Sequence, residues 1–212
     1  LTVQGPTSIA GGTELCKTGD GALMLQGRLA GSGALRVLGG DLYLAGPNSL
    51  HTGPTTVSGG HLYVQAAGAL GGDGLTVEAN GLATISAAQT TGDVRADGTV
   101  TIAAGSGLVQ TGAYSAGGGG FAPAITLESG VELNVASIQA EGVTVNAGGQ
   151  LTLRGASVTV SDVNSLSVAS GGAVDVMTNE LRVHYGDDPS VFNEVLQWID
   201  DGEIFSSDAD GS

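Results

Sequence analysis

The pattern that decides the fold reads Gly-Gly-Asp-Leu-Tyr-Leu at residues 39–44 and returns as Gly-Gly-His-Leu-Tyr-Val at residues 59–64. In both copies a glycine turn leads into residues that alternate between polar and apolar. The pattern recurs at a step of about 20 residues, with an interruption between residues 102 and 131. Its other copies lie at residues 19–25, 80–85, 97–102, 130–135, 148–153 and 171–176. A repeat of this length indicates a chain built from stacked, similar units.

The alternation within each copy places the Leu and Val side chains on one face of a short strand. Further short strands are expected at residues 35–37, 75–77, 143–145, 158–160, 166–168 and 181–183. Strands this short are stable only if each coil stacks on the next, so that backbones pair in parallel ladders and aliphatic side chains form one interior column. The sequence therefore predicts an all-β fold, a right-handed single-stranded parallel β-helix with about 20 residues per coil.

The 38 glycines suit the corners of such a solenoid. A sharp corner often needs a positive φ, which glycine adopts without a Cβ clash. The glycine run at residues 117–120 lies where the repeat is interrupted and is expected to form a loop that bulges from one coil. It matches neither a P-loop nor a dinucleotide-binding fingerprint. We therefore interpret the glycines as architectural and expect no bound cofactor.

The alternation stops after residue 183, and residues 187–202 have the pattern of a helix. Asp187 or Asp188 can cap its N-terminus, and Gly202 can end it. One apolar stripe, with Trp198 at its margin, contains Val191, Phe192, Val195, Leu196 and Ile199. Because this stripe must be covered, the helix is predicted to cap the open end of the last coil. The chain thus divides into a parallel β-helix at residues 1–185 and a capping helix with an acidic tail at residues 186–212.

The charge balance excludes two classes of partner. The chain has 21 acidic and six basic side chains, a formal net charge of −15, and such a field repels nucleic acid and anionic membrane surfaces. Ten acids and one base lie from residue 175 onward, a local net charge of −9. No run reaches the roughly 18 apolar residues of a membrane-spanning helix. We therefore expect neither nucleic-acid binding nor membrane insertion by this segment.

One stretch carries a family resemblance. Residues 15–27, Leu-Cys-Lys-Thr-Gly-Asp-Gly-Ala-Leu-Met-Leu-Gln-Gly, resemble the core of the autotransporter-associated β-strand repeat, Leu-Thr-Lys-Thr-Gly-x-Gly-x-Leu-x-Leu-x-Gly. Residues 48–64 and 68–71 are similar to the second half of that repeat, and residues 26–45 add one coil between the halves. The resemblance implies a β-helical stem of a secreted or surface-displayed bacterial protein, with an extracellular, non-catalytic role. It brings no catalytic residue with it.

An enzymatic role is an alternative to this structural role, because parallel β-helices can present carboxylates on adjacent coils. Asp20 and Asp41, or Asp73 and Asp93, could stack one coil apart. Aspartates beside glycine turns are more often turn formers than acid–base catalysts. His51 and His61 are half a coil apart, and Cys16 has no suitably spaced histidine, so the sequence does not predict a zinc site. We expect no catalytic residues and no enzyme activity.

Calcium is the more credible metal. The last residues, Ser-Asp-Ala-Asp-Gly-Ser at 207–212, resemble the opening of a calcium loop, with Asp208 and Asp210 as candidate oxygen ligands. The alternative interpretation is a solvated acidic tail.

The leading functional hypothesis is a secreted or cell-surface scaffold, structural or adhesive, whose stacked coils supply length and rigidity. Leu1-Thr2-Val3 resembles a strand in mid-coil, so the chain either continues upstream or docks at this edge. Pairing of that edge with another copy would build a head-to-tail fibre. The alternative is a carbohydrate-binding or polysaccharide-processing β-helix, with a cell-surface polysaccharide as ligand. Its best feature is the pair Tyr43 and Tyr63, which occupy equivalent repeat positions and could stack on a sugar if both rings face outward.

Overall fold

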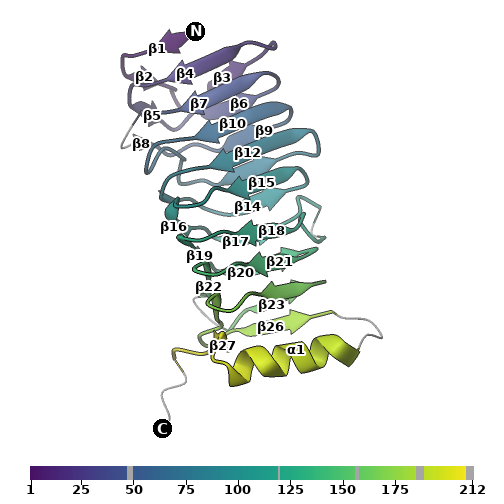
Figure 1. Ribbon diagram of the computed structural model, residues 1–212. Coiled ribbons are helices and arrows are strands. Elements are labelled where there is room, and N and C mark those ends of the chain that lie inside the picture. Colours follow the sequence, from purple (N-terminus) through teal and green to yellow (C-terminus); the bar gives the residue numbers. More distant parts are fainter. Residues whose placement is uncertain (47–49, 119, 156–157, 185–188, 209–212) are drawn as a thin grey trace.

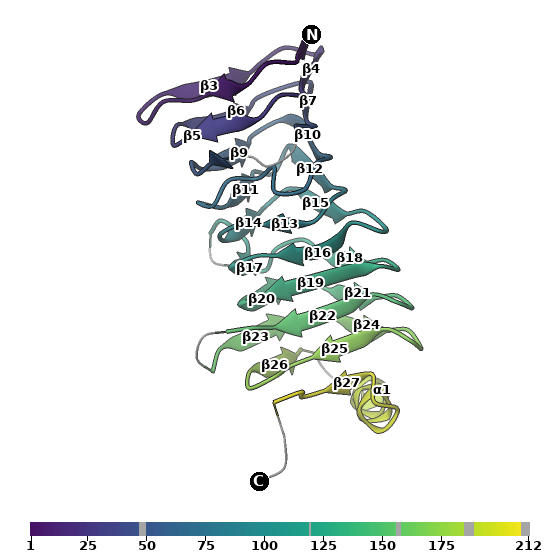
Figure 2. The ribbon, with the colours of Figure 1, turned by 90° about the vertical axis from the view of Figure 1, so that its left-hand side faces the viewer.

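The computed structural model confirms a parallel β-helix that carries a C-terminal helix (Figure 1). It describes residues 1–46, 50–118, 120–155, 158–184 and 189–208. Every strand pair that the structure describes is parallel, and each sheet runs along the solenoid axis as the coils stack (Figure 2). The first two sheets contain nine strands each, so the described residues make about nine coils.

Three walls enclose the interior. Wall 1 contains β1 (Thr2–Val3), β4 (Ala22–Leu25), β7 (Asp41–Leu44), β10 (Gly60–Val64), β12 (Gly81–Ile85), β15 (Thr99–Ile102), β18 (Ile125–Leu127), β21 (Val143–Val145) and β24 (Leu166–Val168). Wall 2 contains β3 (Glu14–Lys17), β6 (Ala34–Val37), β9 (Thr55–Val57), β11 (Leu75–Val77), β14 (Val94–Ala96), β17 (Ala113–Ser115), β20 (Ser137–Ala140), β23 (Val160–Val163) and β26 (Glu180–Val183). Wall 3 contains β2 (Thr7–Ser8), β5 (Leu29–Gly31) and β8 (Leu50–His51), and then β13 (Gln89–Thr90), β16 (Gly107–Gln110), β19 (Val131–Val135), β22 (Gln150–Leu153), β25 (Ala173–Asp175) and β27 (Ile204–Phe205).

The core is a stack of aliphatic side chains in register. Along the inner face of wall 1, one buried column passes through Leu25, Leu44, Val64, Ile85, Ile102, Leu127, Val145 and Val168. Each member loses its surface to the coil above and the coil below, because strands in a sheet lie about 4.8 Å apart. Burial of this continuous column supplies the stability that no single short strand could have.

The interrupted stretch at residues 102–131 contains a full coil. Strands β16, β17 and β18 lie there, and the expected loop joins β17 to β18 across described residues 116–118 and 120–124. Tyr114 of β17 takes an inward position in place of an aliphatic residue, and burial raises the pKa of its hydroxyl to about 12. That hydroxyl donates to the Pro123 carbonyl in the loop, 3.4 Å away. The loop therefore gives a hydrogen-bond partner to the buried Tyr114 hydroxyl.

The repeat pattern also changes walls at this coil. Its copies at residues 22–25, 41–44, 60–64, 81–85 and 99–102 are strands of wall 1, whereas those at 131–135, 150–153 and 173–175 are strands of wall 3. The glycine-turn pattern thus specifies a strand that follows a tight corner. It does not specify which wall that strand joins.

One predicted strand was misplaced. The sequence predicted a strand at residues 158–160, but β23 covers Val160–Val163, and Val158 is 71% exposed. Ser161 and Val163 are the fully buried residues of this strand. The serine occupies a core position because its hydroxyl accepts a hydrogen bond from the Ile138 amide, 3.1 Å away. The alternation Val-Thr-Val therefore indicated the wrong strand position.

Wall 3 is open between β8 and β13, where residues 65–74 contain no strand. Buried Gln89 bridges the opening, donating to the carbonyls of Ala66 at 2.8 Å and Ala87 at 3.1 Å. It also accepts from the Leu70 amide at 3.1 Å. A cavity of about 380 Å³ lies here, beside His51, whose Nε2 is 2.7 Å from the Gly33 carbonyl oxygen. The hydrogen bonds of Gln89 take the place of the ladder bonds that a wall 3 strand at residues 65–74 would make.

The C-terminal helix α1 covers Pro189–Asp200, within the predicted range, and lies beneath the last coil (Figure 1). The predicted buried stripe was partly wrong. Val191, Val195 and Trp198 are partly buried, whereas Phe192, Leu196 and Ile199 are exposed to 53%, 44% and 50%. The end of a solenoid is narrow, so it covers only one line of side chains on a helix that crosses it. After the helix, β27 pairs with β25 and returns the chain to wall 3. None of the helices that the structure describes is long and apolar enough to cross a membrane.

Candidate functional site

Tyr43 and Tyr63 lie side by side on the outer face of wall 1. Their flanking residues Leu42, Leu44, Leu62 and Val64 fill the core, so both rings point outward and are half-buried. The two residues are partners in the ladder between β7 and β10. Their ring centroids are 4.5 Å apart and the planes differ by 4°. The repeat therefore builds a parallel aromatic stack along the solenoid axis.

His61 extends this stack. Its ring centroid lies 3.8 Å from that of Tyr63, with planes 20° apart, and its Nε2 is 2.7 Å from the Thr84 hydroxyl of the following coil. Both ring faces of Tyr63 are thus occupied, one by Tyr43 and the other by His61. Tyr43 keeps one ring face toward the preceding coil, where Met24 holds the equivalent strand position. We call Tyr43, His61 and Tyr63 the aromatic stack.

Two members of the aromatic stack, His61 and Tyr43, have pKa values shifted toward their uncharged forms. Desolvation lowers the pKa of His61, and the nearby Asp41 carboxylate opposes this only in part. Desolvation also raises the pKa of Tyr43, assisted by the charge of Asp41 and by the Tyr63 hydroxyl. The stack presents hydroxyl groups and ring edges on the outer face of wall 1, and only Tyr43 has a ring face that no other aromatic ring of the stack occupies. Stacking on a sugar needs a ring face, so Tyr43 is the better placed of the two tyrosines.

Hydroxyl side chains continue this outward row along wall 1. Thr84 and Thr101 are register partners, and so are Thr126 and Thr144 two coils further on. All four are at least partly exposed. The outer face of wall 1 is therefore aromatic near its start and lined by threonine hydroxyls beyond it.

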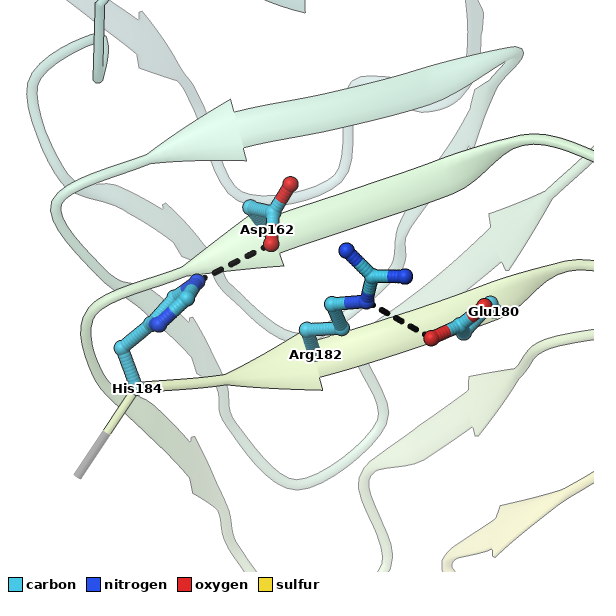
Figure 3. Close-up of polar contacts among 4 residues, drawn as sticks. All are labelled: Asp162, Glu180, Arg182 and His184. Carbon is cyan, nitrogen blue, oxygen red and sulfur yellow. Dashed lines mark hydrogen bonds and ion pairs between the residues drawn. The ribbon is translucent and has the colours of Figure 1, made fainter.

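A second polar group, which the sequence analysis did not assemble, lies on wall 2 at the last two coils (Figure 3). Arg182 Nε donates to Glu180 Oε1 at 2.7 Å, and His184 Nε2 lies 2.9 Å from Asp162 Oδ1. The first bond lies within β26, and the second joins β23 to the residue after β26. Phe121 meets the His184 ring edge-on with centroids 6.0 Å apart. We call Asp162, Glu180, Arg182 and His184 the polar cluster.

The polar cluster could have been found from its spacing. Positions 180, 182 and 184 alternate with Leu181 and Val183, so they share the outer face of one strand, and Asp162 lies opposite Arg182 in the ladder. The pKa of Arg182 is raised, mainly by the hydrogen bond to Glu180 and secondly by the negative charge of Glu180. The side chains of Arg182 and His184 are both 53% exposed. Solvent screens ion pairs as exposed as these, so this group orders the surface more than it stabilises the fold.

The candidate calcium ligands are placed only in part. Asp208 is exposed at the end of the described chain, and Asp210 lies outside the described residues. Within the ranges that the structure describes, no three His, Cys, Asp or Glu side chains are grouped so that they could hold a metal ion. The calcium site therefore stays a prediction.

The start of the tail is positioned by a residue that the sequence analysis overlooked. Asp175 Oδ1 accepts hydrogen bonds from the amides of Met177 at 2.9 Å and Ser207 at 3.0 Å. Burial acts to raise the pKa of Asp175, but these bonds and the charge of Arg154 outweigh it and hold the pKa below its usual value. The Asp175 carboxylate thus anchors the residues that follow β27.

Comparisons of this chain with protein-family models, with curated proteins and with solved structures found no match in any of the three.

Proposed function

We propose that the chain is a non-enzymatic, extracellular scaffold of a bacterial surface-displayed or secreted protein, structural or adhesive in role. The observation that carries the proposal is the unbroken stacking of two nine-stranded parallel sheets over the length of the chain. Bending such a rod strains hydrogen bonds in every coil at once, which suits a stem. The resemblance of residues 15–27 to the autotransporter-associated repeat and the single cysteine support the same role.

The location can be tested with an antibody against the purified chain. Intact cells of the source organism are expected to be labelled as strongly as permeabilised cells, because the epitope lies outside the membrane. A protease added to intact cells should then remove the signal. Labelling that requires permeabilisation would contradict the extracellular role.

A head-to-tail fibre is the assembled form of this proposal. Helix α1 lies across the end of the last coil, so a junction must include it or displace it. A single rod of nine coils is about 40 Å long at a rise of about 4.8 Å per coil. Negative-stain microscopy, with small-angle scattering in calcium and in chelator, should show filaments if copies join. Loss of filaments in chelator would give Asp208 and Asp210 a role at the junction, and single rods in both conditions would rule out the fibre.

Polysaccharide binding is a second candidate function, favoured by the outward orientation of both tyrosines of the aromatic stack. If a sugar ring stacks here, Tyr43→Ala is expected to weaken binding more than Tyr63→Ala, because the two faces of the Tyr63 ring are already occupied by Tyr43 and His61. Loss of one sugar–aromatic contact should reduce affinity by about tenfold. Titration of each variant with soluble cell-wall polysaccharide measures this, and equal affinities of the wild type and both variants would contradict sugar stacking.

A further inference from the structure

Wall 2 ends in an open strand edge. Strand β26 pairs with β23 on one side, and no strand that the structure describes pairs with its other side. The Glu180 and His184 amides donate toward the β23 coil, to Thr159 at 3.0 Å and Val163 at 2.8 Å. Alternate residues of a strand direct their amides to opposite sides. The amides of Leu181 and Val183 therefore point toward the open edge, where a further strand would bond.

An apolar groove of about 320 Å³ adjoins this edge. Strand β26 contributes Leu181 and Val183, helix α1 contributes Val195 and Ile199, and Ile204 comes from β27. In the view along the helix axis, α1 lies beneath one side of the last coil and β26 lies on the other side (Figure 2). Leu181 and Val183 are only partly buried at this end of the interior column, beside the open strand edge. Side chains of an added strand would continue that column into the groove.

The surroundings of the groove are acidic. Glu180 lines it, and Glu194, Asp200, Asp201 and Glu203 lie on or just after the helix. Arg182 is the one Lys or Arg from residue 175 onward in the sequence, against ten acids. This charge disfavours an acidic partner and favours one whose outward side chains are basic.

From these three features we propose that the free edge of β26 and its groove bind an extended peptide segment of another polypeptide, in which aliphatic residues alternate with Lys or Arg. The segment adds a parallel or antiparallel strand to wall 2, its aliphatic side chains enter the groove, and its basic side chains face the acidic surface. The site lies at the opposite end of the chain from the aromatic stack and does not depend on the scaffold role.

The probe is a fluorescein-labelled, acetylated Lys-Val-Lys-Val-Lys-Val amide, titrated by fluorescence anisotropy against the intact chain. Binding in the micromolar range is expected, with weakening as salt increases. Ile199→Lys should reduce affinity at least about tenfold, because it places a cation in the groove. Phe192→Lys is the matched control. It adds the same charge to the same helix at a site of similar exposure, 53% against 50%, but does not line the groove, so affinity should be retained.

Two N-methylated analogues test strand addition itself. One analogue is methylated at the three lysine amides and the other at the three valine amides. A strand bonded along one edge uses every second amide, so one analogue should lose binding and the other should keep it. No binding up to about 1 mM, equal binding of both analogues, or equal loss in the two protein variants would overturn the proposal.

Discussion

Replacing Leu62 by alanine is expected to lower the free energy of unfolding by about 2–5 kcal/mol, the range for a large-to-small change in a closed core. Leu62 is completely buried on the inner face of β10. Its ladder partners are Leu42 in the coil above and Ala83 in the coil below. Because one of these partners is already an alanine, little neighbouring side chain is present to fill the space, and the cost should lie in the upper half of that range.

The matched control is Leu82→Ala in the next coil. Leu82 lies on β12, next to Ala83, but faces outward and is 42% exposed. Its removal should cost less than about 1 kcal/mol, because a partly exposed leucine gives up only part of its transfer free energy. Urea denaturation followed by circular dichroism measures both variants. Equal losses would mean that the inward and outward faces of wall 1 have been assigned wrongly.

The destabilisation caused by Leu62→Ala should appear first in the coils next to the substitution. Each coil of a solenoid contacts only its neighbours, and β10 pairs only with β7 and β12. Hydrogen exchange of Leu62→Ala is therefore expected to rise first at residues 41–44, 60–64 and 81–85, before the C-terminal coils respond. A uniform rise along the whole chain would indicate that the coils unfold as one unit.

The sequence was sufficient to predict the coil. In the copy at residues 59–64, a glycine corner followed by Leu62 and Val64 was enough to predict a strand with those two side chains on one face, although the orientation of Tyr63 stayed open. The wall that each strand joins could not be predicted, because the side-chain alternation is the same in all three walls. The pattern therefore gave no sign that the copies at residues 131–135 and 150–153 had moved from wall 1 to wall 3. That assignment depends on how many residues each corner contains, and the corner lengths vary.

The sites were harder to predict than the coil for a related reason. Tyr43 and Tyr63 were found because they repeat at the same position, and a repeat fixes the partners in a parallel ladder. Asp162 and His184 lie on coils related by the regular step of 20 residues, but His184 is two positions beyond Arg182, the ladder partner of Asp162, so the repeat does not pair them. No feature of the sequence indicated which apolar side chains of α1 are exposed. Phe192 and Val191 are both apolar, and only the position of the helix on the last coil decides which is covered.

Of three glycine-to-alanine substitutions, Gly60→Ala is expected to be the most destabilising. The three variants separate two reasons why a corner needs glycine: a positive φ, and close contact with the backbone of the neighbouring coil. Gly60 has a φ of +73°, and a Cβ there would overlap the carbonyl oxygen of Gly40 in the preceding coil. Backbone strain of about 1–2 kcal/mol in the left-handed region then adds to the cost of moving that coil. We expect a total loss of about 3 kcal/mol or more, near the upper end for single substitutions.

The two control variants each keep one of these costs. Gly12 has a φ of +75° but no atom within 4 Å of its Cβ position, so Gly12→Ala should cost only the strain, about 1–2 kcal/mol. Gly81, the ladder partner of Gly60, has no positive φ, but its Cβ would overlap the Val57 carbonyl oxygen. In urea unfolding, Gly60→Ala should have a lower free energy of unfolding than either control, because it alone combines backbone strain with overlap of the neighbouring coil. If Gly12→Ala is as destabilising as Gly60→Ala, contact between coils at the corners is not what requires glycine, and the tight corner is needed only for its backbone conformation.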